Sequence, residues 1–153
     1  MLVRNGRKAE TPLLGLDDLR PCMAFSSLRR IELNTEWNVG LTDSDLPRLI
    51  PAWPNLEHLL INEYFGWNTR GGITPDGLVQ LLQTCRSLRA IAIAIDTRGY
   101  TEVPPTSRAL TSLGLTSPAA FHINVLDSII EADSVPAIAA CLVTSIVPCP
   151  NNF

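Results

Sequence analysis

Leucine and isoleucine recur along the chain in a pattern that repeats itself. Three segments align without gaps, each reading L-x-x-L-x-L with isoleucine at some anchors. Their anchors are Leu28, Ile31 and Leu33, then Leu56, Leu59 and Ile61, then Leu88, Ile91 and Ile93. A fourth, weaker copy has Leu110, Leu113 and Leu115. Because the last two anchors of each copy alternate, each copy predicts a short strand that points both anchors into a core.

The segments between these strands carry helix signals. Thr42 and Thr74 align as N-caps, because a hydroxyl can accept from the free N–H groups at a helix start. Pro75 then takes the first helical position, where a missing N–H costs nothing. The apolar faces that follow are Leu46, Leu49 and Ile50 in one segment and Leu78, Leu81 and Leu82 in the other. Pro47 predicts that the first of these helices is short or irregular.

Both ends of the repeat region carry related signals. Thr11-Pro12, with Leu13, Leu16 and Leu19 behind it, predicts a helix that starts at Thr11. Ile123-x-Val125 predicts a further strand, preceded by a tight bend or an edge hairpin near Ser117-Pro118. A last helix, capped by Ser134 or Asp133, would carry Ile138, Cys141 and Leu142.

Together these elements predict an α/β fold. We expect a leucine-rich-repeat-like solenoid in which short parallel strands alternate with helices, with an irregular C-terminal third. The predicted organisation is a flexible N-terminal tail over residues 1–10, a repeat domain over 11–148 and a truncated tail over 149–153.

Two sequence segments make the resemblance to leucine-rich repeats more specific. Trp53-Pro-Asn-Leu-Glu-His-Leu and Leu81-Leu-Gln-Thr-Cys85-Arg-Ser-Leu88 resemble the repeat region of fungal F-box-type leucine-rich proteins, as does the run from Asn124 through Ile130 into the 135–142 segment. The repeat resemblance covers roughly residues 11–145. It implies substrate recognition in ubiquitin ligation, with a substrate or an adaptor protein as the partner.

The sequence departs from that family in two ways. No F-box module is found in residues 1–27, which removes the usual basis for docking to a Skp1-type adaptor. The asparagine that often follows the strand is replaced by Glu36, Tyr64 and Asp96. We therefore expect no asparagine ladder to satisfy the carbonyls of the turns.

Composition narrows the class of protein. Hydrophobic residues make up 46% of the chain and charged residues 18%, which suits a folded core. A formal net charge of −3 argues against nucleic acid as the main partner. No apolar run is long enough to span a membrane, and no export signal is present. We expect an intracellular protein, cytoplasmic or nuclear.

The four cysteines, Cys22, Cys85, Cys141 and Cys149, form no C-x-x-C pair. We therefore expect free thiols rather than a zinc or redox site.

Candidate chemistry is sparse. Gly71-Gly72 lacks the second glycine of a phosphate loop, so we interpret it as a loop that closes onto Thr74. Asp43 and Asp45 are placed to cap a helix or oppose its dipole. His58 and His122 are expected at a surface or interface, although a hydrolase with a Cys/His pair stays a distant alternative. We expect no enzyme, no cofactor and no bound metal.

Strand alternation instead predicts an outward array of side chains. It comprises Arg30, Glu32 and Asn34, then His58, Leu60 and Asn62, then Ala90, Ala92 and Ala94. The array changes from polar to small and apolar across the sheet. Two interpretations of the alanine patch remain open: another part of the chain covers it, or a partner docks on it.

Aromatic residues concentrate in the loops that leave the strands. They are Trp37, Tyr64, Phe65, Trp67 and Tyr100. Either they form a partner-binding hot spot, or each tryptophan caps the apolar end of its own repeat. We predict a protein-binding surface made of Arg30, Glu32, Asn34, His58, Leu60, Asn62, Trp37, Tyr64 and Trp67. The alternative is a truncated or degenerate repeat fragment with no independent activity.

Overall fold

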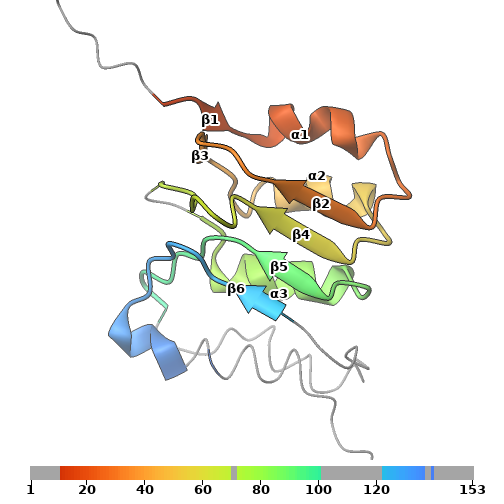
Figure 1. The fold of residues 1–153 in the computed structure, drawn as a ribbon. Coiled ribbons are helices and arrows are strands. Elements are labelled where there is room, and N and C mark those ends of the chain that lie inside the picture. Colours follow the sequence, from red (N-terminus) through yellow and green to blue (C-terminus); the bar gives the residue numbers. More distant parts are fainter. Residues whose placement is uncertain (1–10, 70–71, 101–121, 137–138, 140–153) are drawn as a thin grey trace, which may run out of the picture.

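The computed structural model describes residues 11–69, 72–100, 122–136 and 139. Four short strands form a parallel sheet in the order β2-β4-β5-β6 (Figure 1). They are β2 (Arg30–Leu33), β4 (His58–Ile61), β5 (Ala90–Ala92) and β6 (His122–Asn124). The strands predicted around Ile31, Leu59, Ile91 and Ile123 are therefore confirmed. The protein is a mixed α/β structure with short parallel strands and helices.

The register of this sheet extends the sequence repeat. Ile31 lies opposite Leu59, Leu59 opposite Ile91, and Ile91 opposite Ile123, at spacings of 28, 32 and 32 residues. The two neighbours of β5 in the sheet are β4 and β6. The weaker copy at residues 110–115 and the bend predicted near Ser117-Pro118 lie outside the described residues.

The N-terminal helix was predicted to begin too early. Leu13–Leu14 forms a strand, β1, that pairs in parallel with β3 (Asn38–Val39). The helix α1 (Leu16–Met23) begins only after Gly15, whose backbone N–H donates to the Asp18 carboxylate at 2.8 Å. Pairing with β3 satisfies the backbone of residues 12–14, so tertiary contact overrides the local helix signal there.

The two return segments differ in regularity. α3 (Pro75–Thr84) is a continuous helix, and the Thr74 hydroxyl accepts from the Gly77 N–H as predicted. α2 (Leu46–Leu49) has a single turn and passes into a 3₁₀-helix, η1 (Ile50–Ala52), which confirms the short helix predicted from Pro47.

Thr42 is not a helix cap, contrary to the sequence alignment. Its N–H and its hydroxyl contact the Asp45 carboxylate, and α2 starts beyond that turn. Asp43 instead reaches α3, where its carboxylate accepts from the Thr74 N–H at 2.9 Å. Asp45 stands at the N-cap of α2 but makes no side-chain cap bond there, and Asp43 bonds the start of α3 instead, so the predicted cap role in the first turn of their own helix is wrong.

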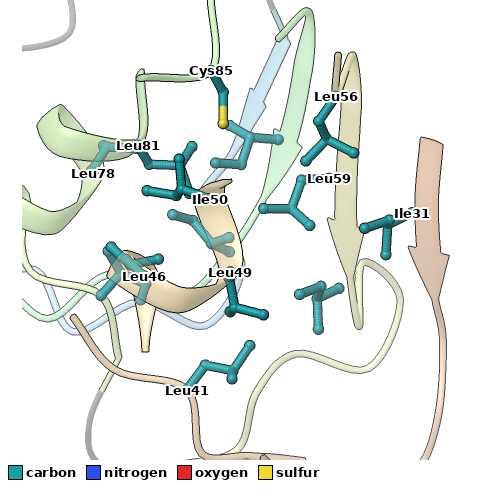
Figure 2. Close-up of a cluster of buried hydrophobic side chains, with 14 of the residues drawn as sticks. Ile31, Leu41, Leu46, Leu49, Ile50, Leu56, Leu59, Leu78, Leu81 and Cys85 are labelled. Carbon is teal, nitrogen blue, oxygen red and sulfur yellow. The ribbon is translucent and has the colours of Figure 1, made fainter. Parts of the chain in front are cut away.

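The core lies between the sheet and the helices α2 and α3, which pack on one of its faces (Figure 1). Figure 2 shows Leu46, Leu49 and Ile50 in one cluster of buried side chains with Ile31 and Leu59 of the strands. Cys85 is buried in the same core, and Cys22 is half-buried; both thiols are free, as expected. Cys141 and Cys149 lie outside the described residues.

The core contains an apolar cavity of about 30 Å³, bounded by α1, α2 and the sheet. Its lining includes Leu19, Leu46, Trp53, Leu59 and Cys85 and presents no polar surface. An apolar space of this kind gives a water molecule no hydrogen-bond partner.

The C-terminal part of the described chain runs from β6 to a 3₁₀-helix, η2 (Ala132–Ser134), and helical residues follow from Val135. The residues expected to line that last helix, Ile138, Cys141 and Leu142, lie outside the described part, as do the predicted tails at 1–10 and 149–153. Across the described ranges, no helix has the length and apolar character that a membrane crossing requires.

Candidate interaction surface

The face of the sheet opposite the helices carries side chains in rows. One row joins Arg30, His58, Ala90 and His122, which lie opposite one another in successive strands. Arg30 and His122 are exposed and His58 is half-buried. The next row joins Glu32, Leu60, Ala92 and Asn124. The rows confirm that alternation places these residues on one face.

Ion pairs organise the polar end of this face. The Arg30 guanidinium lies 2.6 Å from the Glu32 carboxylate along the same strand. Arg29 pairs with Glu57 at 2.9 Å, joining the segments that lead into β2 and β4. Such exposed pairs contribute little stability but fix where the charges lie. Asn34, just beyond β2, is also exposed.

The apolar end of the face is covered from within the chain. Leu60, Ala90 and Ala92 are buried in a small cluster of their own, and Leu126 packs against it. Ala94 belongs to the main core instead. This favours the intramolecular interpretation of the alanine patch, and Leu60, predicted to contact a partner, is not accessible.

The covering residue Leu126 has an unusual backbone. Its φ is +46°, a region that bulky side chains rarely adopt. Its N–H donates to the Asn124 side chain at 3.1 Å, which holds the turn after β6. The segment after β6 is therefore folded back onto the sheet by a defined turn.

Asn62 is a second predicted surface residue that the structure buries completely. Its side-chain oxygen accepts from the Thr35 N–H, and its side-chain nitrogen donates to the carbonyls of Trp37 and Gly66. Its φ of +54° suits asparagine, which tolerates the left-handed region. The sequence predicts no asparagine ladder, and the structure shows one asparagine, Asn62, that bonds turn carbonyls directly after β4.

The aromatic residues after the strands divide into two groups. Trp67 is buried, with 1% of its surface exposed, and its indole N–H donates to the Ile61 carbonyl at 3.0 Å. Trp67 therefore caps the apolar end of its own repeat. The prediction that it contacts a partner is wrong, because its ring is not accessible. Trp37, Tyr64 and Phe65 are 43%, 76% and 50% exposed. We call these three side chains the aromatic rim.

Tyr100 is separate from the aromatic rim. Its hydroxyl donates to the Asp76 carboxylate at 3.1 Å, at the start of α3. Partial burial is the main reason that the pKa of the Tyr100 phenol is raised above its ordinary value.

Asp127 was not predicted, yet it holds the turn that carries Trp67. Its two carboxylate oxygens accept from the N–H groups of Trp67 and Asn68, each at 2.7 Å. A Cβ at Gly66 would lie 2.8 Å from this carboxylate, and φ there is +74°, so both space and backbone favour glycine. The only sequence signal is a short polar pair, Asp127-Ser128, a few residues after a strand.

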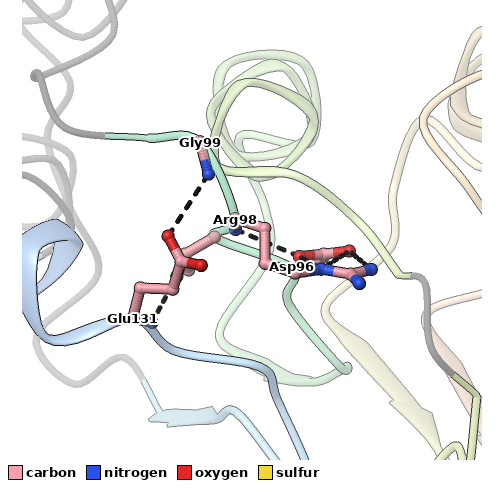
Figure 3. A network of polar contacts seen from close by, with 5 residues as sticks. Asp96, Arg98, Gly99 and Glu131 are labelled. Atoms are coloured by element: carbon pink, nitrogen blue, oxygen red, sulfur yellow. Dashed lines mark hydrogen bonds and ion pairs between the residues drawn. The ribbon is translucent and has the colours of Figure 1, made fainter.

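A polar network ties the loop after β5 to the same C-terminal segment (Figure 3). The Glu131 carboxylate accepts from the Gly99 N–H at 3.4 Å, and the Glu131 N–H donates to the Thr97 hydroxyl at 2.9 Å. Arg98 donates to Asp96 and lowers the pKa of that carboxyl. The Asp96–Arg98 pair therefore stabilises the folded state above pH 3.8, the ordinary pKa of the carboxyl, and this contribution is lost as the pH falls through the lowered pKa.

The histidines and cysteines do not meet in the described part of the chain. His58 and His122 lie on the outer face with one strand between them, whereas Cys85 lies in the core on the other face. Burial raises the pKa of the Cys85 thiol to about 11, which keeps it neutral and poorly nucleophilic. Among the described residues, no group of three or more histidine, cysteine, aspartate or glutamate side chains is arranged to hold a metal ion.

Comparisons with protein-family models, with curated proteins and with solved structures found no match to this chain.

Proposed function

We propose that the chain is a non-catalytic protein–protein interaction module built as a leucine-rich-repeat-like solenoid. The repeated strand–helix units and their constant register support this architecture. In such solenoids each unit contacts its neighbours, and the open sheet face and the turns beside it are available for binding. The proposed role, by resemblance, is substrate recognition by an F-box-type protein in ubiquitin ligation.

The observation that carries this proposal is the aromatic rim beside a polar sheet face. Large aromatic side chains are normally buried, and exposed groups of them mark interaction sites. Here three lie exposed on two turns that hydrogen bonds join to each other. Arg30, Glu32 and His122 extend the accessible surface along the sheet.

Site-specific photo-crosslinking in cells tests the proposed surface. A photoreactive residue at Tyr64 or Arg30 should give discrete adducts with another protein. The same residue at Arg48 or Gln80, which are exposed on α2 and α3 behind the sheet, is the matched control. Adducts that form equally from both sides, or from neither, would contradict the proposed surface.

The ubiquitin-ligation role needs a separate test. The full-length gene product should co-purify with a Skp1-type adaptor, and the interaction should map to F-box helices outside the repeat region. Failure to bind any such adaptor would remove this role while leaving a binding function intact.

The second candidate is a truncated or degenerate repeat fragment with no independent activity. The reduction of α2 to a single turn and the unfilled cavity beside it favour this reading. The isolated chain discriminates between the two: a soluble monomer that melts cooperatively counts against a fragment. A hydrolase is the third candidate, and it would require turnover that depends on His58 or His122.

A further inference from the structure

The aromatic rim is held on a rigid base. The turn after β2 carries Trp37, and the turn after β4 carries Tyr64 and Phe65. The Asn62 side chain bonds the Trp37 carbonyl at 2.8 Å, and the Val39 N–H donates to the Trp67 carbonyl at 2.9 Å. A surface whose backbone is already ordered loses less entropy when it binds, which favours specific recognition.

Negative charge accompanies the exposed aromatics. Glu36 directly precedes Trp37, and Glu63 directly precedes Tyr64. Glu36 is exposed and Glu63 is half-buried. Within residues 11–69, 72–100 and 122–136, neither carboxylate forms an ion pair. The arginines that do form ion pairs there are Arg20, Arg29, Arg30 and Arg98.

The remaining described arginines lie elsewhere. Arg48 belongs to α2, and Arg86 and Arg89 precede β5. Asp127 lies near the turn after β4, but its carboxylate already accepts from two backbone N–H groups. Among the described residues, no arginine therefore neutralises the carboxylate of Glu36 or of Glu63.

This combination matches the chemistry of arginine and lysine. A guanidinium or ammonium group is attracted to the faces of tryptophan and tyrosine rings, and carboxylates beside the ring strengthen the attraction. Arginine suits both the aromatic rings and the carboxylates, because it stacks on rings and forms paired hydrogen bonds with carboxylates. An acidic segment would meet repulsion at the same place.

We infer that the aromatic rim, with Glu36 and Glu63, binds a basic, arginine- or lysine-containing segment of a partner protein. This inference rests on the proposed interaction function and names the class of its partner. The aromatic rings supply contact area, and the two carboxylates supply the preference for positive charge.

A random short-peptide display library, selected against the folded chain, tests the inference. Arginine and lysine should be enriched in the selected peptides. The leading peptide should quench or shift Trp37 fluorescence, because Trp53 and Trp67 are buried and Trp37 is exposed. Its binding should weaken as ionic strength rises, because salt screens the carboxylates.

Variants assign the binding to the rim. Trp37→Ala and Tyr64→Ala should each weaken the leading peptide by about tenfold, the scale of one cation–π contact. The double variant Glu36→Lys, Glu63→Lys should shift a repeated selection toward acidic peptides. Arg48→Ala on α2 is the matched control and should change nothing. Cooperative melting establishes that each variant is folded.

Each contrary outcome separates this inference from the proposed function. Peptides without basic enrichment that still depend on Trp37 and Tyr64 would overturn the basic partner and keep the interaction role. Peptides that respond to Arg30→Ala but not to rim variants would overturn the rim and also keep that role. A selection that enriches no peptide would overturn both.

Discussion

The chain contains the dipeptide Trp-Asn twice after a strand, at Trp37-Asn38 and at Trp67-Asn68, and the two copies are used in opposite ways. Trp37 follows the end of β2 by four residues, whereas Trp67 follows the end of β4 by six. Asn38 enters β3, while Asn68 takes a left-handed turn with φ of +53°. In these two copies the longer turn carries the buried ring and the shorter turn carries the exposed one.

Of the two tryptophans, replacing the buried Trp67 should lower the stability of the fold most. Trp67→Ala removes a fully buried ring and should lower the free energy of unfolding by about 3–5 kcal/mol. Trp67→Phe keeps most of the volume but leaves the Ile61 carbonyl without its donor, at a smaller cost of about 1–2 kcal/mol. Urea denaturation followed by circular dichroism measures both, and equal losses would mean that packing of the ring does not matter.

Asn62 joins the two turns, so its loss should loosen both at once. Asn62→Gly keeps the left-handed backbone and removes three hydrogen bonds, for an expected loss of about 2–3 kcal/mol. Asn62→Ala should cost roughly 1 kcal/mol more because alanine disfavours positive φ. If the alanine variant were as stable as the glycine variant, backbone conformation would not contribute.

Among the described residues, Asp127 bonds only the turn that carries Trp67. Asp127→Ala should cost about 1–2 kcal/mol because the N–H groups of Trp67 and Asn68 lose their acceptors. Hydrogen exchange should accelerate at those two amides and stay unchanged at Trp37. Asp133→Ala, at an exposed position on η2, is the control and should have little effect. Faster exchange in both turns would contradict a local role.

Trp37 should show the smallest effect on stability. Trp37→Ala removes a side chain of which 43% is exposed, so the free energy of unfolding should fall by only about 1 kcal/mol, far less than for the fully buried Trp67. The same denaturation experiment measures it. A loss comparable to that of Trp67→Ala would mean that Trp37 is a core residue and would remove it from the aromatic rim.

The strands of the sheet could be predicted from the sequence, whereas the contacts made by the segments at its ends could not. Period-two alternation around Ile31, Leu59 and Ile91 predicts the strands, because burial on one face dictates which residues alternate. The cap at Thr74 was also predictable, since Pro75 and the apolar face beyond it agree with a helix start. These features depend on residues close together in the chain.

One of the failures has a local cause, and the other has its cause in a contact between distant residues. Thr42 and Thr74 align, yet only Thr74 caps a helix, because Pro47 and Pro51 lack the N–H groups that a longer α2 would use. Leu13 joins a strand because of a partner at Asn38.

The same limit applies to the candidate surface. Arg30, Glu32 and Asn34 are exposed as predicted, and Tyr64 and Trp37 are accessible. Asn62 is not accessible because it bonds Thr35, Trp37 and Gly66, and Trp67 is not because its ring packs in the main core. Leu60 is not accessible because Leu126 arrives to pack against it from a segment more than 60 residues later. Alternation along one strand carries no information about such a segment.

The cavity beside α2 has a consequence for how the protein responds to hydrostatic pressure. A void of about 30 Å³ in the folded state disappears when the chain unfolds and water reaches every side chain. The unfolded state therefore occupies less total volume, and compression favours it. Pressure should open the α2 side of the core first, while the continuous α3 and its capped start keep their packing longer.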